Sequence, residues 1–242
     1  MSASSPQGES LFSAAAGASS LEGEGELYTP SEHTRGPWDP GALHGGAPAA
    51  LLTAAFERLQ TGAAPSPEGE LRIARLGFEF LRPVPLVPLK LSLRVVRPGR
   101  RVQELAGELS VRAPADDGSK GPGEELVVCR ASALRVRAIP ADVPTTQTAA
   151  NPGGDGADAA MGTPEDATPL GFALDGSTRA SFASSAMEMR ALGQGGWDPR
   201  QLGSGQVWMR LRQALLDGEE PTPLTRLAAT ADFGNGISAA LP

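Results

Sequence analysis

The 242-residue sequence has few of the features on which several classes of protein depend. Its single cysteine, Cys129, excludes an internal disulfide and a metal site built from cysteines, and it fits a reducing, cytoplasmic location. No apolar run approaches the roughly 18–20 residues that cross a bilayer. The first residues, MSASSPQGES, place no positive charge ahead of an apolar stretch. We therefore expect neither a membrane span nor a secretory signal.

Basic residues are scarce relative to acidic ones. The chain has 21 lysines and arginines against 28 aspartates and glutamates, a formal charge of −7, and its basic residues form no cluster along the sequence. Because such a sequence lacks the positive footprint that nucleic acid requires, no nucleic-acid partner is expected. The two histidines lie far from any cysteine or paired carboxylates, which argues against a metal site.

The motifs of three large enzyme classes are missing as well. The sequence contains no Walker loop, no dinucleotide-binding glycine fingerprint and no Gly-x-Ser-x-Gly elbow. Phosphoryl transfer, nicotinamide chemistry and an α/β-hydrolase triad are therefore not expected. We expect no cofactor.

Glycine and proline are abundant, with 30 and 22 residues, and they divide the chain. Residues 1–26 are mainly Ser, Ala, Gly and Glu, which cannot bury enough surface to offset the entropy of ordering, so a disordered tail is predicted. Residues 141–169 have the same character and predict a flexible linker. Two structured domains are expected beside the linker, over residues 27–140 and 170–242.

The first domain begins with a helix and continues with strands. Apolar residues between 47 and 59 recur at spacings of three and four, with Glu57 on the polar side, which predicts an amphipathic helix. Alternating apolar and polar residues predict antiparallel strands at 76–80, 89–95, 102–112 and 126–138, and residues 27–29 are compatible with the start of another. One helix packed against a curved antiparallel sheet defines an α+β fold.

The second domain has fewer elements. Two strands are predicted at 181–192 and 206–216, and a helical stripe follows. The stripe consists of Leu224, Leu227, Ala228 and Ala231. Two strands make a marginal sheet for a helix to pack on.

Three sequence blocks carry a family resemblance: TRGPWDPGALHGGAPAALL, FEFLRPVPLVPLKLSLRVVRPGRRVQ and GQVWMRLRQALLDGEEPTPLTRLAATADFGNGIS. They resemble the thioesterase-like proteins with two fused hotdog domains, related to acyl-CoA thioesterase II, in which a long helix is wrapped by an antiparallel sheet. The resemblance implies two tandem hotdog domains. Members of that family continue past the second helix with further strands, so it also implies that the second hotdog of this sequence is incomplete.

The same resemblance implies a function. The substrate would be an acyl-CoA thioester, hydrolysed to free acid and CoA in the cytoplasm, without a membrane partner and with a homo-oligomer formed through the sheets. Two alternatives stay open, because catalytic polar residues of the absent strands have no counterpart here. One is a non-catalytic acyl-CoA-binding or scaffold protein, and the other is a hotdog-type enoyl-CoA hydratase that would use His44 as its base.

The candidate site begins at His44, Gly45 and Gly46. Glycines at the start of a helix let a ligand approach backbone N–H groups, and the positive end of the helix dipole favours an anion such as a thioester oxyanion, so we expect these residues to bind substrate. The alternative is that the glycines bind no ligand and only allow a tight turn and close packing of the helix on the sheet.

A carboxylate is the usual group that activates water. Single-domain hotdog thioesterases place it nine residues after the histidine, where this sequence has Thr53. The resemblance therefore leaves Thr53 to line the acyl channel and assigns the catalytic role to Asp232, which would orient water. The alternative for Asp232 is a hydrogen bond into the turn that follows it.

Other polar residues give weaker indications. His33, beside Thr34 and Arg35, is either at the mouth of a pocket or simply on the surface. Arginines near the strands could bind the phosphates of coenzyme A, because guanidinium groups match phosphate, or could be solvated. These arginines are Arg82, Arg94, Arg97, Arg100 and Arg101.

Overall fold

The computed structural model describes residues 9–15, 25–59, 69–112, 123–138, 163–170, 179–192 and 206–234. Its helices and strands, in chain order, are β1 (Phe12–Ala14), β2 (Glu26–Pro30), α1 (Gly46–Arg58), β3 (Leu71–Phe80), β4 (Leu89–Arg97), β5 (Val102–Arg112), β6 (Glu125–Arg137), β7 (Thr168–Pro169), β8 (Met187–Leu192), β9 (Gln206–Leu211) and α2 (Pro223–Thr230). The predicted order of one helix followed by four strands is confirmed. None of the described helices is long and apolar enough to span a membrane.

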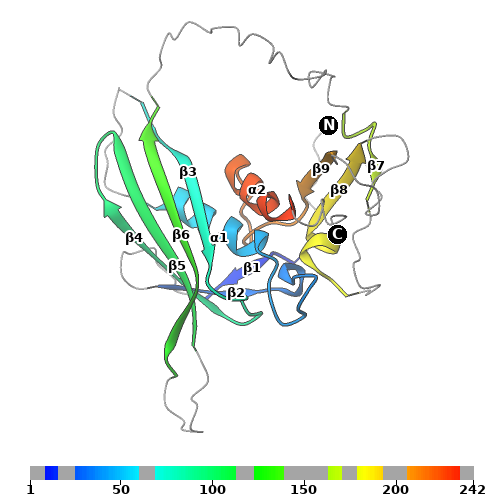
Figure 1. Cartoon of the computed structure of the whole chain (residues 1–242), viewed down its shortest axis with the longest axis horizontal. Helices are drawn as coiled ribbons and strands as arrows, with labels where there is room; N and C mark the ends of the chain where they lie inside the picture. Colours follow the sequence, from blue (N-terminus) through cyan, green and yellow to red (C-terminus); the bar gives the residue numbers. More distant parts are fainter. Residues whose placement is uncertain are drawn as a thin grey trace, which may run out of the picture.

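The first six strands form one antiparallel sheet that curves around α1 (Figure 1). The strand order is β1-β2-β4-β5-β6-β3, so β3 lies at one edge. Residues of β5 and β6 alternate between the two faces, and the odd-numbered ones, such as Leu105 and Ala133, are buried beneath the helix. This alternation is the signal that predicted the strands from the sequence.

Helix α1 is buried more completely than its sequence suggests. Every residue from Gly46 to Phe56 is buried, whereas the apolar pattern predicts an amphipathic helix with one polar side. The reason is that α2 covers α1 on the side away from the sheet (Figure 1). Small alanine side chains on both sides of α1 allow this two-sided packing, and only the last turn, from Glu57, is exposed.

One glycine of the sheet sets the distance between the sheet and α1. A Cβ atom at Gly107 of β5 would lie 3.1 Å from side-chain carbons of both Leu52 and Phe56. A side chain at this position would therefore push the helix outward. The close approach fixes the distance between the second half of α1 and the sheet.

The predicted disordered tail over residues 1–26 is wrong for residues 9–15. Leu11 and Phe12 are fully buried, and β1 pairs with β2. The Phe12 N–H also donates to the Leu215 carbonyl at 2.9 Å, which joins the first sheet to the segment after β9. The remainder of the tail, residues 1–8 and 16–24, lies outside the described residues.

The second sheet has three described strands in the order β7-β8-β9. Strand β7 falls at the end of the predicted linker, so that prediction is wrong from residue 163 onward, while residues 139–162 are outside the described part. The strand predicted at 181–192 starts only at Met187, because Phe182–Ala186 form a π-helix instead. Ser181 and Ser184 form a capping box, in which each side chain accepts a backbone N–H of the other residue. This capping stabilises the helical turn over the strand that the sequence predicted.

Candidate active site

The loop before α1 is held by backbone hydrogen bonds. The Leu43 N–H donates to the Val84 carbonyl at 2.8 Å, and the His44 N–H donates to the Thr34 carbonyl at 2.9 Å. These bonds tie the loop both to the segment after β3 and to the short helical turn Glu32–Thr34. These hydrogen bonds therefore hold the start of α1 in place.

The His44 ring belongs to a cluster with two aromatic side chains, which also stack on each other. It stacks on Phe182 with ring centroids 5.1 Å apart and on Phe233 with centroids 4.4 Å apart, and only 9% of the residue is exposed. The Gly46 N–H donates to His44 Nδ1 at 3.1 Å, so the proton of the neutral ring lies on Nε2. Burial lowers the pKa of His44, and the nearby Asp232 carboxylate only partly opposes this. His44 is accordingly neutral at pH 7.

Asp232 lies beside the start of α1, although it is almost 190 residues away in sequence. It belongs to the short turn Ala231–Phe233 that follows α2, and its Oδ2 is 3.5 Å from His44 Nδ1. That distance exceeds the usual range of a hydrogen bond, and a neutral ring leaves the charge of the carboxylate uncompensated. The Asp232 side chain is 49% exposed, so water can reach it.

Gly45 and Gly46 allow this arrangement for two different reasons. A Cβ atom at Gly45 would lie 2.7 Å from Asp232 Oδ2, so the absence of a side chain makes room for the carboxylate. A Cβ atom at Gly46 would lie 2.3 Å from the Ala229 carbonyl oxygen of α2, so Gly46 allows the two helices to touch. Gly45 therefore makes room for the Asp232 carboxylate in the site, and Gly46 allows close packing of α1 against α2.

The Gly45 N–H is a free donor at this position. Among the hydrogen bonds of the described residues it has no acceptor, whereas the next two N–H groups bind the side chain and the carbonyl of His44. Gly45 is partly exposed and provides no side-chain cap for α1. An unoccupied N–H at the positive end of a 13-residue helix, next to a carboxylate, can bind a polarised carbonyl oxygen.

The opposite end of the helix pair is joined by Glu57, which the sequence assigned only to the polar side of α1. Glu57 Oε2 accepts hydrogen bonds from the Thr222 and Thr225 hydroxyls at 2.7 and 3.1 Å. Thr222 is the N-cap of α2, so the end of α1 meets the start of α2. Because His44 and Asp232 meet at the other end, the helices run antiparallel, and Glu57 positions α2 along α1. No local sequence signal distinguishes Glu57 from a solvated glutamate.

Two other sequence candidates lie apart from this group. Thr53 is fully buried about two helical turns along α1, where its hydroxyl donates to the Ala49 carbonyl at 2.8 Å. His33 Nδ1 lies 2.8 Å from the Ser185 hydroxyl in the π-helix that also carries Phe182. The structure therefore brings together His44, Gly45, Gly46 and Asp232, and leaves Thr53 as a prediction without a contact to them.

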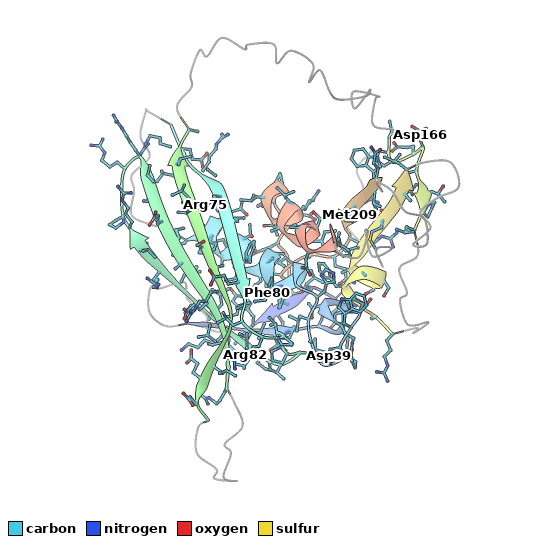
Figure 2. All side chains as sticks on the ribbon, viewed as in Figure 1. Asp39, Arg75, Phe80, Arg82, Asp166 and Met209 are labelled. Atoms are coloured by element: carbon cyan, nitrogen blue, oxygen red, sulfur yellow. The ribbon has the colours of Figure 1, made fainter. Side chains whose placement is uncertain are left out.

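Phe80 is a member of the site that the sequence did not single out. It ends β3, is 44% exposed, and its Cζ would lie 3.2 Å from a Cβ atom at Gly45 (Figure 2). An exposed aromatic ring beside a free N–H and a carboxylate gives the site one apolar side. Among the described residues, no three histidine, cysteine or carboxylate side chains are grouped in a way that could hold a metal ion.

Comparison with known proteins agrees with this architecture. Residues 34–136 match the family model of the acyl-CoA thioesterase N-terminal domain, and residues 164–242 match that of the acyl-CoA thioesterase C-terminal domain. The comparison with curated proteins gives no match. These two matches define a protein of the thioesterase type.

Solved structures show the same fold. A candidate thioesterase from Novosphingobium aromaticivorans is 19% identical, with a TM-score of 0.58 over 90% of this chain and 72% of that chain. A hotdog-fold protein of unknown function from Alicyclobacillus acidocaldarius is 17% identical, with a TM-score of 0.56 over 92% and 70%. A candidate thioesterase II from Thermobifida fusca is 15% identical, with a TM-score of 0.52 over 92% and 68%. The chain belongs to the thioesterase-like hotdog family, and its predicted α+β hotdog fold is confirmed.

Proposed function

We propose that the protein hydrolyses acyl-CoA thioesters to free acid and CoA. The observation that carries this proposal is the meeting of the Asp232 carboxylate with the free Gly45 N–H at the start of α1, since a Cβ atom at Gly45 would lie 2.7 Å from Asp232 Oδ2. One group can hold the thioester oxygen while the other binds water. The thioesterase family membership favours this chemistry over others that a carboxylate and an N–H could perform.

The reaction follows from these positions. The Gly45 N–H donates a hydrogen bond to the thioester carbonyl oxygen, and the α1 dipole favours the negative charge that develops on that oxygen. Asp232 takes a proton from a water molecule as the water oxygen attacks the carbonyl carbon. The tetrahedral intermediate then breaks its carbon–sulfur bond, and the thiol leaves with the proton. Phe80 forms an apolar side of the site, and His44 supports Gly46 without acting on the substrate.

The hydratase alternative would make His44 the base. Its Nδ1 already accepts the Gly46 N–H at 3.1 Å, and its buried ring packs against Phe182 and Phe233. Asp232 is the more accessible base, which favours hydrolysis. A cytoplasmic location and a homo-oligomer through the sheets remain predictions, the first supported by the single cysteine.

The test is release of free thiol from acyl-CoAs of increasing chain length, read with a thiol reagent. Cys129, the only protein thiol, is buried, and burial raises its pKa to about 12, so native protein contributes little background. We expect Asp232→Asn to lower kcat by about 10²-fold or more, because it removes the base. The matched control is Asp166→Asn, which makes the same aspartate-to-asparagine change at an exposed position beside the second sheet (Figure 2). Its kcat should equal that of wild type. Equal rates in the two variants would dispose of the assignment, and tight acyl-CoA binding without any turnover would favour the non-catalytic alternative.

A further inference from the structure

A group of arginines gathers at one end of the first sheet, where β3 and β5 begin and β4 and β6 end. We call it the arginine surface, and it consists of Arg72, Arg75, Arg94, Arg97, Arg100, Arg101 and Arg137. Four of them, Arg94, Arg97, Arg100 and Arg101, are close together in sequence, whereas Arg72, Arg75 and Arg137 are distant from these four. The antiparallel order of four strands brings them together.

The register of the sheet places much of this surface on the face away from α1. Arg97 pairs with Glu104, Glu104 with Leu134, and Leu134 with Arg75, which makes one row across four strands. In the next row Arg72 pairs with Val136, and Val136 with Val102. The alternating neighbours of these residues, such as Gln103 and Ala133, are buried on the α1 side.

The positive charge of this surface is largely uncompensated. Within the described residues, Arg72 is the only one of the seven that pairs with a carboxylate, that of Glu70 at 3.9 Å. Six of the seven arginines are exposed, and Arg137 is partly buried with its guanidinium on backbone carbonyls. The whole chain has a charge of −7, so this end is opposite in sign to the rest of the molecule. Such a surface attracts an acidic partner and orients it.

Shape and composition indicate what kind of acidic partner fits. The rows cross three strand spacings, about 14 Å, which is wider than a single phosphate group needs. Their centre is half-buried and mainly aliphatic, with Val102, Leu134 and Val136 beside Glu104 and with arginines around them, an arrangement typical of protein–protein interfaces. No aromatic side chain is among the described residues of these rows, so a nucleotide base would find no ring to stack on.

The surface is also connected to the candidate active site through β3. Arg75 lies near the middle of this edge strand, and Phe80, beside Gly45, ends it (Figure 2). Five residues of extended chain separate them, about 17 Å. Because β3 is an edge strand, a flexible arm attached to a partner on the arginine surface could pass around this edge and reach Gly45 and Asp232 on the α1 side.

We propose that the arginine surface docks an acidic carrier protein that presents the acyl group as a thioester on a phosphopantetheine arm. This rests on the proposed thioester hydrolysis, since coenzyme A and such a carrier share the pantetheine thioester and differ in what is attached beyond its phosphate. The carrier supplies the wide acidic face that the surface requires. Coenzyme A alone engages only part of it.

Binding of a phosphopantetheine-bearing acidic carrier protein, measured by titration calorimetry, tests the proposal directly. Arg97→Glu with Arg101→Glu should weaken binding at least tenfold, and wild-type affinity should fall as salt rises to about 0.3 M, because the contact is between exposed charges. The matched control is Arg112→Glu with Arg212→Glu, the same charge change at exposed positions elsewhere, which should change affinity less than about twofold. Equal binding by both double variants, or no binding by wild type, overturns the proposal.

Three further measurements separate this docking from other roles. Loss of coenzyme A binding in the Arg97/Arg101 variant would make the surface a nucleotide subsite, and binding to phosphatidylglycerol vesicles but not to carrier would make it a lipid surface; either result overturns the proposal. Hydrolysis of a short N-acetylcysteamine thioester should be the same in wild type and both variants. If wild type hydrolyses no thioester, the proposed function fails, while the calorimetry still decides the docking.

Discussion

The two helices at the centre of the molecule begin in opposite ways. The start of α2 is closed: its first residue, Pro223, has no N–H, and the N-cap Thr222 accepts the Thr225 N–H at 3.1 Å and donates to Glu57. The start of α1 has a glycine at the N-cap and no side-chain cap. One helix start is satisfied by protein groups, whereas the other is left for a ligand.

The contrast explains how one helix pair can be both stable and reactive. The closed end holds α2 in register along α1, and the antiparallel arrangement then delivers Asp232 to the open end. An open helix start without a second group would bind an anion but could not activate water. The fold therefore separates positioning, at Glu57, from chemistry, at Gly45 and Asp232.

Closing the open end should have the largest effect on activity. Gly45→Ala would place a methyl group 2.7 Å from Asp232 Oδ2 and push the carboxylate away from the free N–H. We expect a loss of about 10²-fold or more in kcat, the usual contribution of a positioned general base. Steady-state thioester hydrolysis measures this loss.

The control for this variant is Gly41→Ala in the same loop. Its Cβ would lie 3.4 Å from the Asp39 carboxylate oxygen, an ordinary contact, so activity should stay close to wild type. Circular dichroism and the urea midpoint check that both variants fold. Wild-type kcat in a folded Gly45→Ala protein would show that the open end plays no part in catalysis.

Opening the closed end should have a smaller effect. Glu57→Ala removes the acceptor of both threonine hydroxyls, so α2 loses its anchor and Asp232 shifts relative to Gly45. We expect kcat to fall about tenfold with little change in KM, because a displacement well below 1 Å already costs rate. Glu57→Gln keeps an oxygen acceptor and should restore most of kcat. If the glutamine variant is as slow as the alanine variant, charge rather than position is what Glu57 contributes.

The sequence predicts those parts of the molecule that local patterns determine. The strands of the first sheet and α1 have strong periodicity, and each is found near its predicted limits. Strand β1 escaped prediction because three residues carry no periodic signal, and its burial depends on pairing with β2 and with the segment after β9. The π-helix at Phe182–Ala186 was missed because its residues also fit a strand, and the serine capping decides the outcome.

The residues of the candidate site also fall into those that the sequence could identify and those that only the tertiary fold reveals. The family resemblance selected His44, Gly45, Gly46 and Asp232, and the structure brings these four together. Glu57 could not be selected, because its significance depends on residues brought close only by the tertiary fold. Of the arginine surface, the sequence singled out Arg94, Arg97, Arg100 and Arg101, but not their gathering with Arg72, Arg75 and Arg137, which also depends on the fold. Long-range placement, rather than residue type, turns a solvated glutamate into an anchor and scattered arginines into a surface.

The smallest expected effect concerns the stability of the open end at low pH. Burial lowers the pKa of His44 in the folded protein, while an unfolded histidine titrates near about 6.5. Above that pH both states are neutral, and below it the unfolded state binds a proton that the folded state refuses, so the free energy of unfolding falls with falling pH. From pH 7 to pH 5 the contribution is at most about 2 kcal/mol, at 1.36 kcal/mol per pH unit. Urea unfolding at both pH values should therefore show a larger loss in wild type than in His44→Phe or His44→Gln, which cannot titrate. The same loss in all three proteins would mean that the ring stacked on Phe182 and Phe233 accepts a proton as readily as a solvated one.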